Sequence, residues 1–323
     1  MQASFSELEY AAKKKQTRRD RFLSEIDAVT PWVELERTVT PYYPSRGGRG
    51  RPPIGLSRML RMYVAQQCFG LSDEGIEDAI YDSQAIRRFV GIDLNRESAP
   101  DATTLLNFRH LLESHQLTES IFNTINGHLA AKGLLLREGT IVDATLIASP
   151  PSTKNKEGKR DPDMHQSKKG KQWYFGMKAH IGADAESGLV HTVRGTSGHV
   201  SDIAEGNTLL HGDETVAFGD AGYQGIEKRA DATPDVTWHV AMRPGKRKAL
   251  DKDNQADAMI DKAEKLKASV RAKVEHPFRV IKRQFGFVKV RYRGLKKNTA
   301  QLMTLFALSN LWMVRGKLME AQG

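Results

Sequence analysis

Cysteine is almost absent from this chain of 323 residues, which contains only Cys68. A single cysteine excludes an intrachain disulfide, and it also excludes the cysteine-rich zinc modules. A reducing, intracellular setting is therefore the expectation. Residues 1–21 are polar and charged and lack the apolar segment of a secretory signal, so we expect none.

Long hydrophobic runs are missing as well. The most apolar stretch, residues 302–314, is 13 residues long and includes Thr304, Ser309 and Asn310. A membrane-spanning helix needs roughly 20 apolar residues. We therefore predict a buried core helix here and no membrane partner. Hydrophobic residues make up 39% of the chain and charged residues 27%, which favours a globular protein over a disordered one.

Acidic residues are outnumbered, and the net charge is +10. A basic chain favours a polyanionic partner, although ribosomal, membrane-surface and plain basic proteins share this property. The surplus is concentrated in residues 262–297, where thirteen lysines and arginines stand against two acids. This stretch is either a surface for DNA phosphates, whose contacts supply much of the affinity for DNA, or a set of solvated side chains.

The composition predicts three parts along the chain. Residues 1–45 form a basic N-terminal helical arm. Residues 46–134 form a smaller all-helical domain, which begins with a loop rich in glycine and proline. Residues 135–323 form an α/β domain.

Local signals support the helical reading of the second part. Ser72 precedes an apolar periodic segment, as a helix N-cap does, and Pro100-Asp101 precedes another predicted helix. Gly133 follows the last such segment as a stop signal. Several short helices joined by tight turns are compatible with a helix-turn-helix-like DNA-binding domain. They are equally compatible with any small helical bundle.

The third part alternates strands and helices. Predicted strands cover residues 140–147, 174–181, 189–193, 215–218 and 236–241. Predicted helices cover residues 202–210, 257–283 and 299–318, and residues 154–171 are predicted to form a polar loop. This order predicts an α/β layer with a hairpin among its first three strands.

Two aspartates occupy costly positions in these strands. Asp143 lies inside an apolar, β-branched run, where a carboxylate needs a metal ion or a charged partner unless it faces solvent on an edge strand. Asp220 lies at the end of the predicted strand 215–218. Gly219 and Gly222, one before it and one after it, allow other groups to approach closely. An ordinary turn aspartate before a glycine is the alternative for Asp220.

A glutamate occupies the long helix that follows. At 100° per residue, Glu275 falls in a charged stripe with Arg271 and Lys282, beside an apolar stripe. A solvated face with salt bridges gives the same pattern. Pro277 lacks a backbone donor, so we expect it to kink the helix or to restart it.

Together these three acids form a more specific pattern than any one of them. If the two strands are neighbours and the helix packs across them, Asp143, Asp220 and Glu275 converge. Converging carboxylates repel one another, and oxygen-rich sites of this kind suit Mg²⁺ or Mn²⁺. Two such ions activate the attacking oxygen and stabilise the leaving oxygen in phosphodiester chemistry. In a basic protein, cleavage of DNA or RNA strands is the natural hypothesis.

The three acids and the residues around them resemble a known family, the bacterial insertion-sequence DDE transposases of the IS-five group. Residues 218–223, Phe-Gly-Asp-Ala-Gly-Tyr, resemble the motif of its second aspartate. Arg271, Glu275 and Lys282 fit its Tyr-x2-Arg-x3-Glu-x6-Lys spacing, although Ala268 stands at the tyrosine position. The resemblance covers about residues 45–318 and extends to the helical segment after residue 50.

The resemblance implies an RNase H-like catalytic domain, with a mixed sheet and flanking helices, preceded by a smaller all-helical DNA-binding domain. It implies that Asp143, Asp220 and Glu275 are the catalytic residues and hold two Mg²⁺ or Mn²⁺ ions. The partners it implies are double-stranded DNA, at the element ends and at the target, and a second copy of the chain in a homodimer or larger synaptic complex. The implied location is the bacterial cytoplasm, in association with the nucleoid.

Further basic residues are candidates for DNA contacts. Lys178 and His180 share one face of a predicted strand and point either at the site or at solvent. Arg49 and Arg51 belong to a sequence that resembles the core of an AT-hook, or they lie in a plain basic hinge. The full set of predicted DNA contacts is Arg271, Lys282, Arg279, Lys178, His180, Arg49 and Arg51.

Two other functions remain open for this sequence. A stand-alone metal-dependent DNA nuclease would use the same acids without joining strands. A non-catalytic protein derived from a transposase would keep the fold and bind DNA without cleaving it. The leading hypothesis is a transposase that binds the terminal inverted repeats of its element, cleaves the ends and joins the 3′-hydroxyl groups to target DNA.

Overall fold

The computed structural model describes residues 15–45, 52–136, 138–154, 156, 158–251 and 253–321. The chain forms two compact units: Met1–Ile125 with Val314–Gly323, and Asn126–Met313. The predicted division at residues 46 and 135 stays a prediction. Arg49 and Arg51 lie outside the described residues.

The first unit is built from helices. They are α2 (Arg18–Val29), α3 (Trp32–Val39), the 3-10 turn η1 (Thr40–Tyr42), α4 (Leu56–Phe69), α5 (Asp73–Asp82), α6 (Gln84–Val90) and α7 (Ala102–Ser114), and α8 (Leu117–Ala131) begins here. The predicted N-cap is present, because Ser72 Oγ accepts the Gly75 N–H at 2.9 Å. Asp101 caps α7 as well, and its Oδ1 accepts the Thr104 N–H at 2.6 Å. Gly133 follows α8 with φ +67°, which confirms the stop signal.

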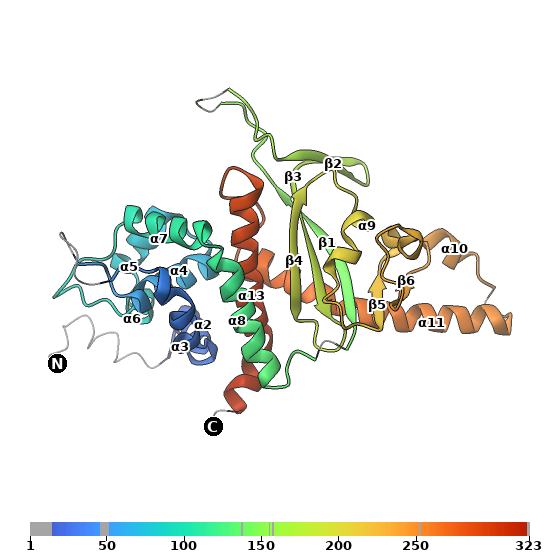
Figure 1. Cartoon of the computed structure of the whole chain (residues 1–323), viewed down its shortest axis with the longest axis horizontal. Helices are drawn as coiled ribbons and strands as arrows, with labels where there is room; N and C mark the ends of the chain where they lie inside the picture. The colour runs from blue at the N-terminus through green and yellow to red at the C-terminus, as the bar shows by residue number, and fades with distance from the viewer. Residues whose placement is uncertain are drawn as a thin grey trace. The chain divides into compact units, whose positions relative to one another are not determined.

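The second unit contains a mixed sheet of six strands (Figure 1). Its strands are β1 (Thr140–Ala148), β2 (His165–Lys169), β3 (Gln172–Asp184), β4 (Val190–Ser197), β5 (Val216–Gly219) and β6 (Thr237–Val240). They run in the order β2-β3-β1-β5-β6, and β4 also pairs with β3. All five predicted strands are present, and β3 and β4 form the expected hairpin. Strand β2 lies in the segment predicted as a loop.

The pairing of β1 with β5 positions the two strand aspartates. These strands are parallel, and Ile141 lies opposite Phe218. Two residues further along each strand, Asp143 and Asp220 therefore come level with each other. On its other side β1 pairs with β3 in antiparallel register, with Asp143 opposite Ile181. Asp143 is thus on a central strand, which removes the edge-strand alternative.

The helices of this unit are more broken than the sequence predicts. They are α9 (Asp202–Glu205), η2 (Asn207–Leu209), η3 (Ala221–Tyr223), η4 (Ile226–Lys228), α10 (Pro244–Lys248), α11 (Gln255–Arg271), η5 (Ala272–Val274), α12 (Glu275–Arg279), the π-helical η6 (Val280–Gln284) and α13 (Leu295–Glu320). The predicted helix 257–283 is divided by a 3-10 turn before Glu275. Pro277 falls in the first turn of α12, where its missing N–H costs little, so the expected restart is confirmed.

Helical segments cover both faces of the sheet. On one face Val142 packs with Leu209, Tyr223 and Ile226 of the short segments η2, η3 and η4. On the other face Lys282 of η6 contacts β1, and Phe278 of α12 meets a ring of α13. This mixed α/β architecture, with a helical region before it, confirms the predicted fold class and is consistent with an RNase H-like fold.

The apolar stretch 302–314 forms part of α13, and Leu302, Phe306 and Leu311 are fully buried. This confirms the predicted core helix. Within the described ranges, none of the helices combines the length and the apolar character needed to cross a membrane.

Candidate active site

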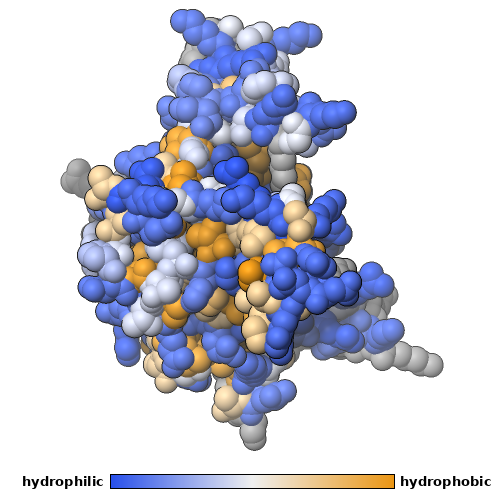
Figure 2. All heavy atoms as spheres, turned by 90° about the vertical axis from the view of Figure 1, so that its right-hand side faces the viewer, coloured by the Kyte–Doolittle hydropathy of each residue, from blue (hydrophilic) through white to orange (hydrophobic). Residues whose placement is uncertain are grey.

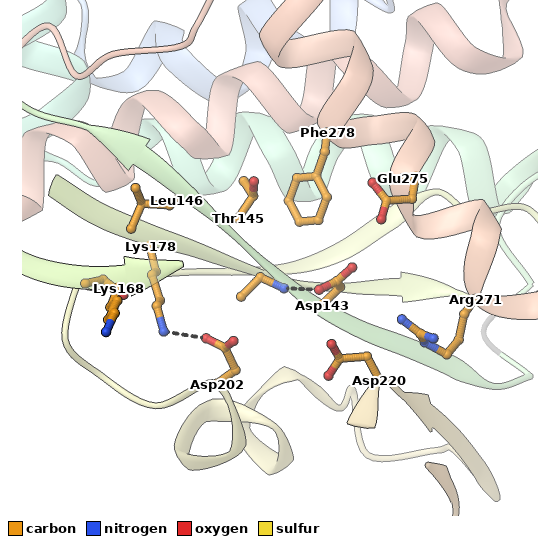
Figure 3. A pocket seen from close by; sticks show the side chains of 12 residues that line it. Asp143, Thr145, Leu146, Lys168, Lys178, Asp202, Asp220, Arg271, Glu275 and Phe278 are labelled. Carbon is orange, nitrogen blue, oxygen red and sulfur yellow. Dashed lines mark hydrogen bonds and ion pairs between the residues drawn. The ribbon is translucent and has the colours of Figure 1, made fainter. Parts of the chain in front are cut away.

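A pocket of about 330 Å³ opens in the second unit. Figure 3 shows the carboxylates of Asp143, Asp220 and Glu275 pointing into it from three different elements. The pocket is lined by Asp143, Ala144, Thr145, Leu146, Ser167, Lys168, Lys178, Asp202, Asp220, Arg271, Glu275 and Phe278. The structure therefore brings together all three acids that the sequence singled out.

The environment of Asp143 shifts its pKa. Its Oδ1 accepts the N–H of Ala144 at 2.7 Å. Burial above all, together with the negative charges of Asp220 and Glu275, raises the pKa of Asp143 to about 7, against the opposing effects of the Ala144 N–H and Arg271. A carboxyl with this pKa is only partly ionised at neutral pH, so a cation in the pocket would favour its charged form.

Asp220 directly follows β5 and caps the short helix η3. Its Oδ1 accepts the Gly222 N–H at 2.8 Å. A β-carbon on Gly222 would lie 2.9 Å from the same oxygen, so a glycine at this position leaves room for the carboxylate. This explains in physical terms why a glycine follows the acid at this spacing.

Glu275 reaches the pocket from the helical side. It is the first residue of α12, and its side chain is exposed. Asp143 and Thr145 share one face of β1 because side chains alternate along a strand, and Lys282 of η6 contacts Thr145 on that face. Glu275 and Asp143 therefore come from facing elements. Arg271, the last residue of α11, lies beside Asp220 (Figure 3).

The pocket fits divalent metal ions of the hard type. Its donors are carboxylate oxygens, the ligands that Mg²⁺ and Mn²⁺ prefer. Burial, together with the charges of Asp143, Asp202 and Asp220, raises the pKa of the Tyr223 hydroxyl. Carboxylates that lie this close together repel one another, and a bound cation relieves that repulsion.

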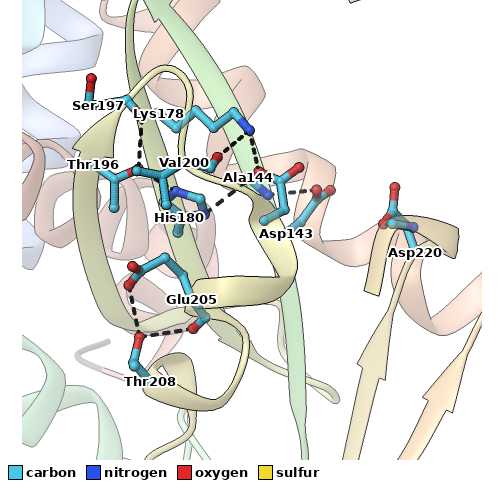
Figure 4. A network of polar contacts seen from close by, with 12 residues as sticks. Asp143, Ala144, Lys178, His180, Thr196, Ser197, Val200, Glu205, Thr208 and Asp220 are labelled. Atoms are coloured by element: carbon cyan, nitrogen blue, oxygen red, sulfur yellow. Dashed lines mark hydrogen bonds and ion pairs between the residues drawn. The ribbon is translucent and has the colours of Figure 1, made fainter. Parts of the chain in front are cut away.

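A fourth acid lies in the pocket, and the sequence reasoning missed it. Asp202 begins α9. Its Oδ1 accepts a hydrogen bond from Lys178 Nζ at 2.8 Å (Figure 3). The same ammonium donates to the Val200 carbonyl at 2.7 Å (Figure 4). The short loop between β4 and α9 brings Asp202 to the pocket, and no motif in the sequence signals this.

His180 lies behind this ion pair and is completely buried. Its Nε2 is 2.7 Å from Thr196 Oγ1 (Figure 4). Its Nδ1 is 4.0 Å from Asp202 Oδ1. Burial lowers the pKa of His180, against the attraction of Asp202. Because the side chain has no exposed surface, His180 does not contact DNA directly in this structure, and the predicted contact is corrected.

The remaining predicted contacts lie along the helical side. Lys282 is half-buried, and its Nζ donates to Thr145 Oγ1 at 2.6 Å and to the Leu146 carbonyl at 3.0 Å. Arg279 is exposed and lines a neighbouring pocket with Glu275. Lys282 thus fastens the helical segment to β1, whereas Arg279 presents its charge to solvent.

Some charge of the 262–297 stretch is neutralised locally. Lys265 pairs with Asp261 at 2.9 Å, and Lys267 pairs with Glu264 at 2.8 Å. The face of the molecule that carries α10 and α11 is mostly hydrophilic, with scattered hydrophobic residues (Figure 2).

Two family models match this chain. The model described as "Transposase DDE domain" matches residues 135–311, which is more than half of the chain. The model described as "Transposase domain (DUF772)" matches residues 10–111. The chain belongs to the DDE transposase family. Transposases act on DNA, and DDE domains typically use divalent metal ions, in agreement with the oxygen-rich pocket of this transposase. Membership of the IS-five group stays a prediction.

Proposed function

We propose that this transposase binds the terminal inverted repeats of its insertion element, cleaves the ends and joins the 3′-hydroxyl groups to target DNA. The observation that carries the proposal is the convergence of Asp143, Asp220 and Glu275 in one pocket. Arg271 and Lys178 give that pocket cationic flanks. A phosphodiester placed there would meet both metal ligands and positive charge.

In this proposal Asp143, Asp220 and Glu275 hold two Mg²⁺ or Mn²⁺ ions. Such ions, when bound, lower the pKa of an attacking hydroxyl and stabilise the leaving oxygen. The protein's own contribution is to hold the acids in place: the Ala144 N–H orients Asp143, and the Gly222 N–H orients Asp220. Water is the nucleophile for cleavage, and the freed 3′-hydroxyl is the nucleophile for joining.

The DNA contacts that we propose differ in kind. Arg271 and Lys178 contact the scissile strand at the pocket, and Arg279 contacts phosphates beside it. Lys282 acts mainly by positioning the helical segment. Arg49 and Arg51 stay proposed contacts to the minor groove.

The proposed reaction on two DNA ends also determines the assembly that we propose. We propose that residues 46–134 read the inverted repeats and that residues 1–45 add basic contacts. Because two ends must be brought together, a homodimer or larger complex on the bacterial nucleoid is part of this proposal. Membership of the IS-five group, on the spacing of Arg271, Glu275 and Lys282, is part of it as well.

A joining assay separates this proposal from a nuclease. Pre-cleaved element ends with a free 3′-hydroxyl are incubated with plasmid and Mg²⁺, and joined products are quantified. Matched ends that terminate in a dideoxynucleotide serve as control, because they lack the nucleophile. We expect joining only with the hydroxyl ends. Cleavage of intact ends without any joining would support the stand-alone nuclease.

Loss of the acid at position 220 separates the proposal from a non-catalytic DNA-binding protein. We expect Asp220→Asn to abolish cleavage and joining while the protein still binds the ends in a gel-shift assay. Full activity of this variant in a cellular transposition assay would contradict the catalytic role.

Binding to DNA should weaken steeply with salt. Each neutralised phosphate contributes about −0.9 to the slope of log K against log salt for duplex DNA. We expect Arg279→Gln to reduce that slope by about one. Arg229→Gln is the control, because Arg229 is already paired with Asp231 at 2.8 Å. A flat salt dependence would argue against phosphate contacts by this surface.

A further inference from the structure

A second group of ligand-type side chains lies outside the pocket, at the opposite end of β5. Asp220 follows β5, whereas Glu214 precedes it. Glu214 and His211 come from the loop between η2 and β5, and His191 comes from β4. A nitrogen of each imidazole and a carboxylate oxygen all lie within 4.8 Å of one another.

The two imidazoles are arranged around the carboxylate. His211 Nε2 is 3.4 Å from Glu214 Oε1, and the side chains of both residues are almost fully buried, at 7% and 0% exposure. That Nε2 is buried and makes no hydrogen bond. The rings of His191 and His211 meet edge to face with centroids 4.8 Å apart. An unpartnered ring nitrogen aimed at a buried carboxylate is an incomplete arrangement.

Glu214 is held in place by neighbours that favour its charged form. Its Oε1 accepts hydrogen bonds from the Thr140 hydroxyl at 2.7 Å and from the His211 N–H at 2.5 Å, and its Oε2 accepts the Gly212 N–H at 2.7 Å. Burial alone would raise the pKa of Glu214, but these hydrogen bonds outweigh it and lower the pKa. These three hydrogen bonds fix both oxygens of the Glu214 carboxylate beside the two imidazoles.

The strand beneath His191 is shaped to admit the ring. A β-carbon on Gly182 of β3 would lie 2.8 Å from His191 Cε1 and 2.2 Å from the Leu209 carbonyl oxygen. A glycine at this position therefore lets the imidazole and the loop backbone come close to the sheet. The arrangement is fixed by the fold and is not an accidental meeting of surface side chains.

We propose that His191, His211 and Glu214 bind one Zn²⁺ ion, or a similar borderline divalent metal, at a site separate from the catalytic pocket. Two imidazoles and a carboxylate suit zinc, whereas Mg²⁺ prefers oxygen donors throughout. The metal connects β4, which carries His191, to the loop before β5, which carries His211 and Glu214. Thr140 at the start of β1 joins this group because its hydroxyl donates to Glu214. Its role is to stabilise the sheet that carries the acids, and the proposal does not depend on DNA cleavage.

His191 has hydroxyl groups at both ring nitrogens. Its Nε2 is 3.0 Å from the Thr140 hydroxyl, which itself donates to Glu214, and its Nδ1 is 2.9 Å from Thr192 Oγ1. With Nε2 of His191 on the metal, its Nδ1–H can donate to Thr192, as is usual for ligating histidines. His211 Nδ1 accepts the Asp213 N–H at 3.3 Å, and a carboxylate oxygen of Asp213 lies 3.8 Å from the same nitrogen.

The test is a zinc titration of the metal-free protein in excess Mg²⁺, which occupies the carboxylate pocket. We expect one tightly bound zinc per chain by elemental analysis and a melting temperature that rises with zinc. His211→Gln should weaken zinc binding at least about a hundredfold and remove the rise in melting temperature. The control is the double variant His165→Gln, His199→Gln, which removes another pair of contacting imidazoles, with centroids 4.4 Å apart.

A second measurement covers the case in which His211→Gln fails to fold. Co²⁺ bound to the unmodified protein should give the intense visible absorption of four- or five-coordinate cobalt with nitrogen ligands, and zinc should displace it. Absence of these bands, or zinc binding that survives His211→Gln but not the control variant, would overturn the proposal. Loss of cleavage activity with zinc binding intact would affect the proposed function only.

Discussion

Replacing Glu275 by glutamine is expected to lower the rate of end cleavage at least about a thousandfold, while the affinity for DNA ends changes little. The side chain is exposed at the start of α12, so the isosteric amide leaves packing intact. The substitution removes one negative charge from the three carboxylates that we propose bind the metal ions. Cleavage is measured on labelled element ends in Mg²⁺, and binding is measured by gel shift in Ca²⁺.

Glu227→Gln is the matched control for this variant. Glu227 is also an exposed glutamate in the first turn of a short helix, η4, but it is not among the residues that line the pocket. It should cleave at the normal rate. An equal loss of cleavage and of end binding in Glu275→Gln would contradict a role in metal binding and point to DNA recognition.

Most strands of the sheet could be predicted from local sequence patterns alone. Strand β1 could be predicted because its apolar, β-branched run leaves few alternatives, and β5 could be predicted from a short apolar run that ends in Asp220. The helix start at Ser72 could be predicted from the side-chain chemistry of an N-cap serine. These signals are local, and the structure preserves them.

Other features depend on contacts between distant segments. Strand β2 is polar and charged, and its place in the sheet comes from pairing with the first half of β3. The helix predicted for residues 257–283 has the right periodicity, yet it is divided at Ala272–Val274 and ends in the π-helical η6. Lys282 of that segment donates to Thr145 and to the Leu146 carbonyl, and a sequence pattern cannot specify such tertiary bonds.

The residues of the candidate active site also differ in how far the sequence alone could predict them. Asp143, Asp220 and Glu275 could be selected because acids in apolar strands and beside glycines are costly. Asp202 could not, because a serine-aspartate helix start is ordinary, and only the pairing with Lys178 reveals its place in the pocket. Trp173 of β3 is 65% exposed, and the Lys168 ammonium lies 5.8 Å from the centroid of its ring. The sequence does not reveal this exposure, because an aromatic residue on a hairpin carries no periodicity that distinguishes core from surface.

Asp143→Asn should make the metal-free protein more stable at pH 8 while it abolishes cleavage. The pKa of Asp143 is raised from 3.8 to about 7 in the folded protein, so the folded state binds more protons than the unfolded state between these values. The stability of the unmodified protein therefore falls as the pH rises through this window, and it stays low above it. Asparagine does not ionise, so the advantage of the variant grows from about pH 4 to about pH 7 and reaches at most about 4 kcal/mol.

Urea unfolding in EDTA at pH 5 and pH 8 measures this difference, and Asp235→Asn, in an exposed loop, is the control that should change stability at neither pH. Adding Mg²⁺ at pH 8 should stabilise the unmodified protein and close the gap, because the ion binds the charged carboxylates of the folded state. Asp143→Asn should gain much less from Mg²⁺. If the variant were less stable than the unmodified protein at pH 8 without metal, Asp143 would be a structural ion-pair partner, and the argument that its charge is unbalanced until a cation binds would be wrong.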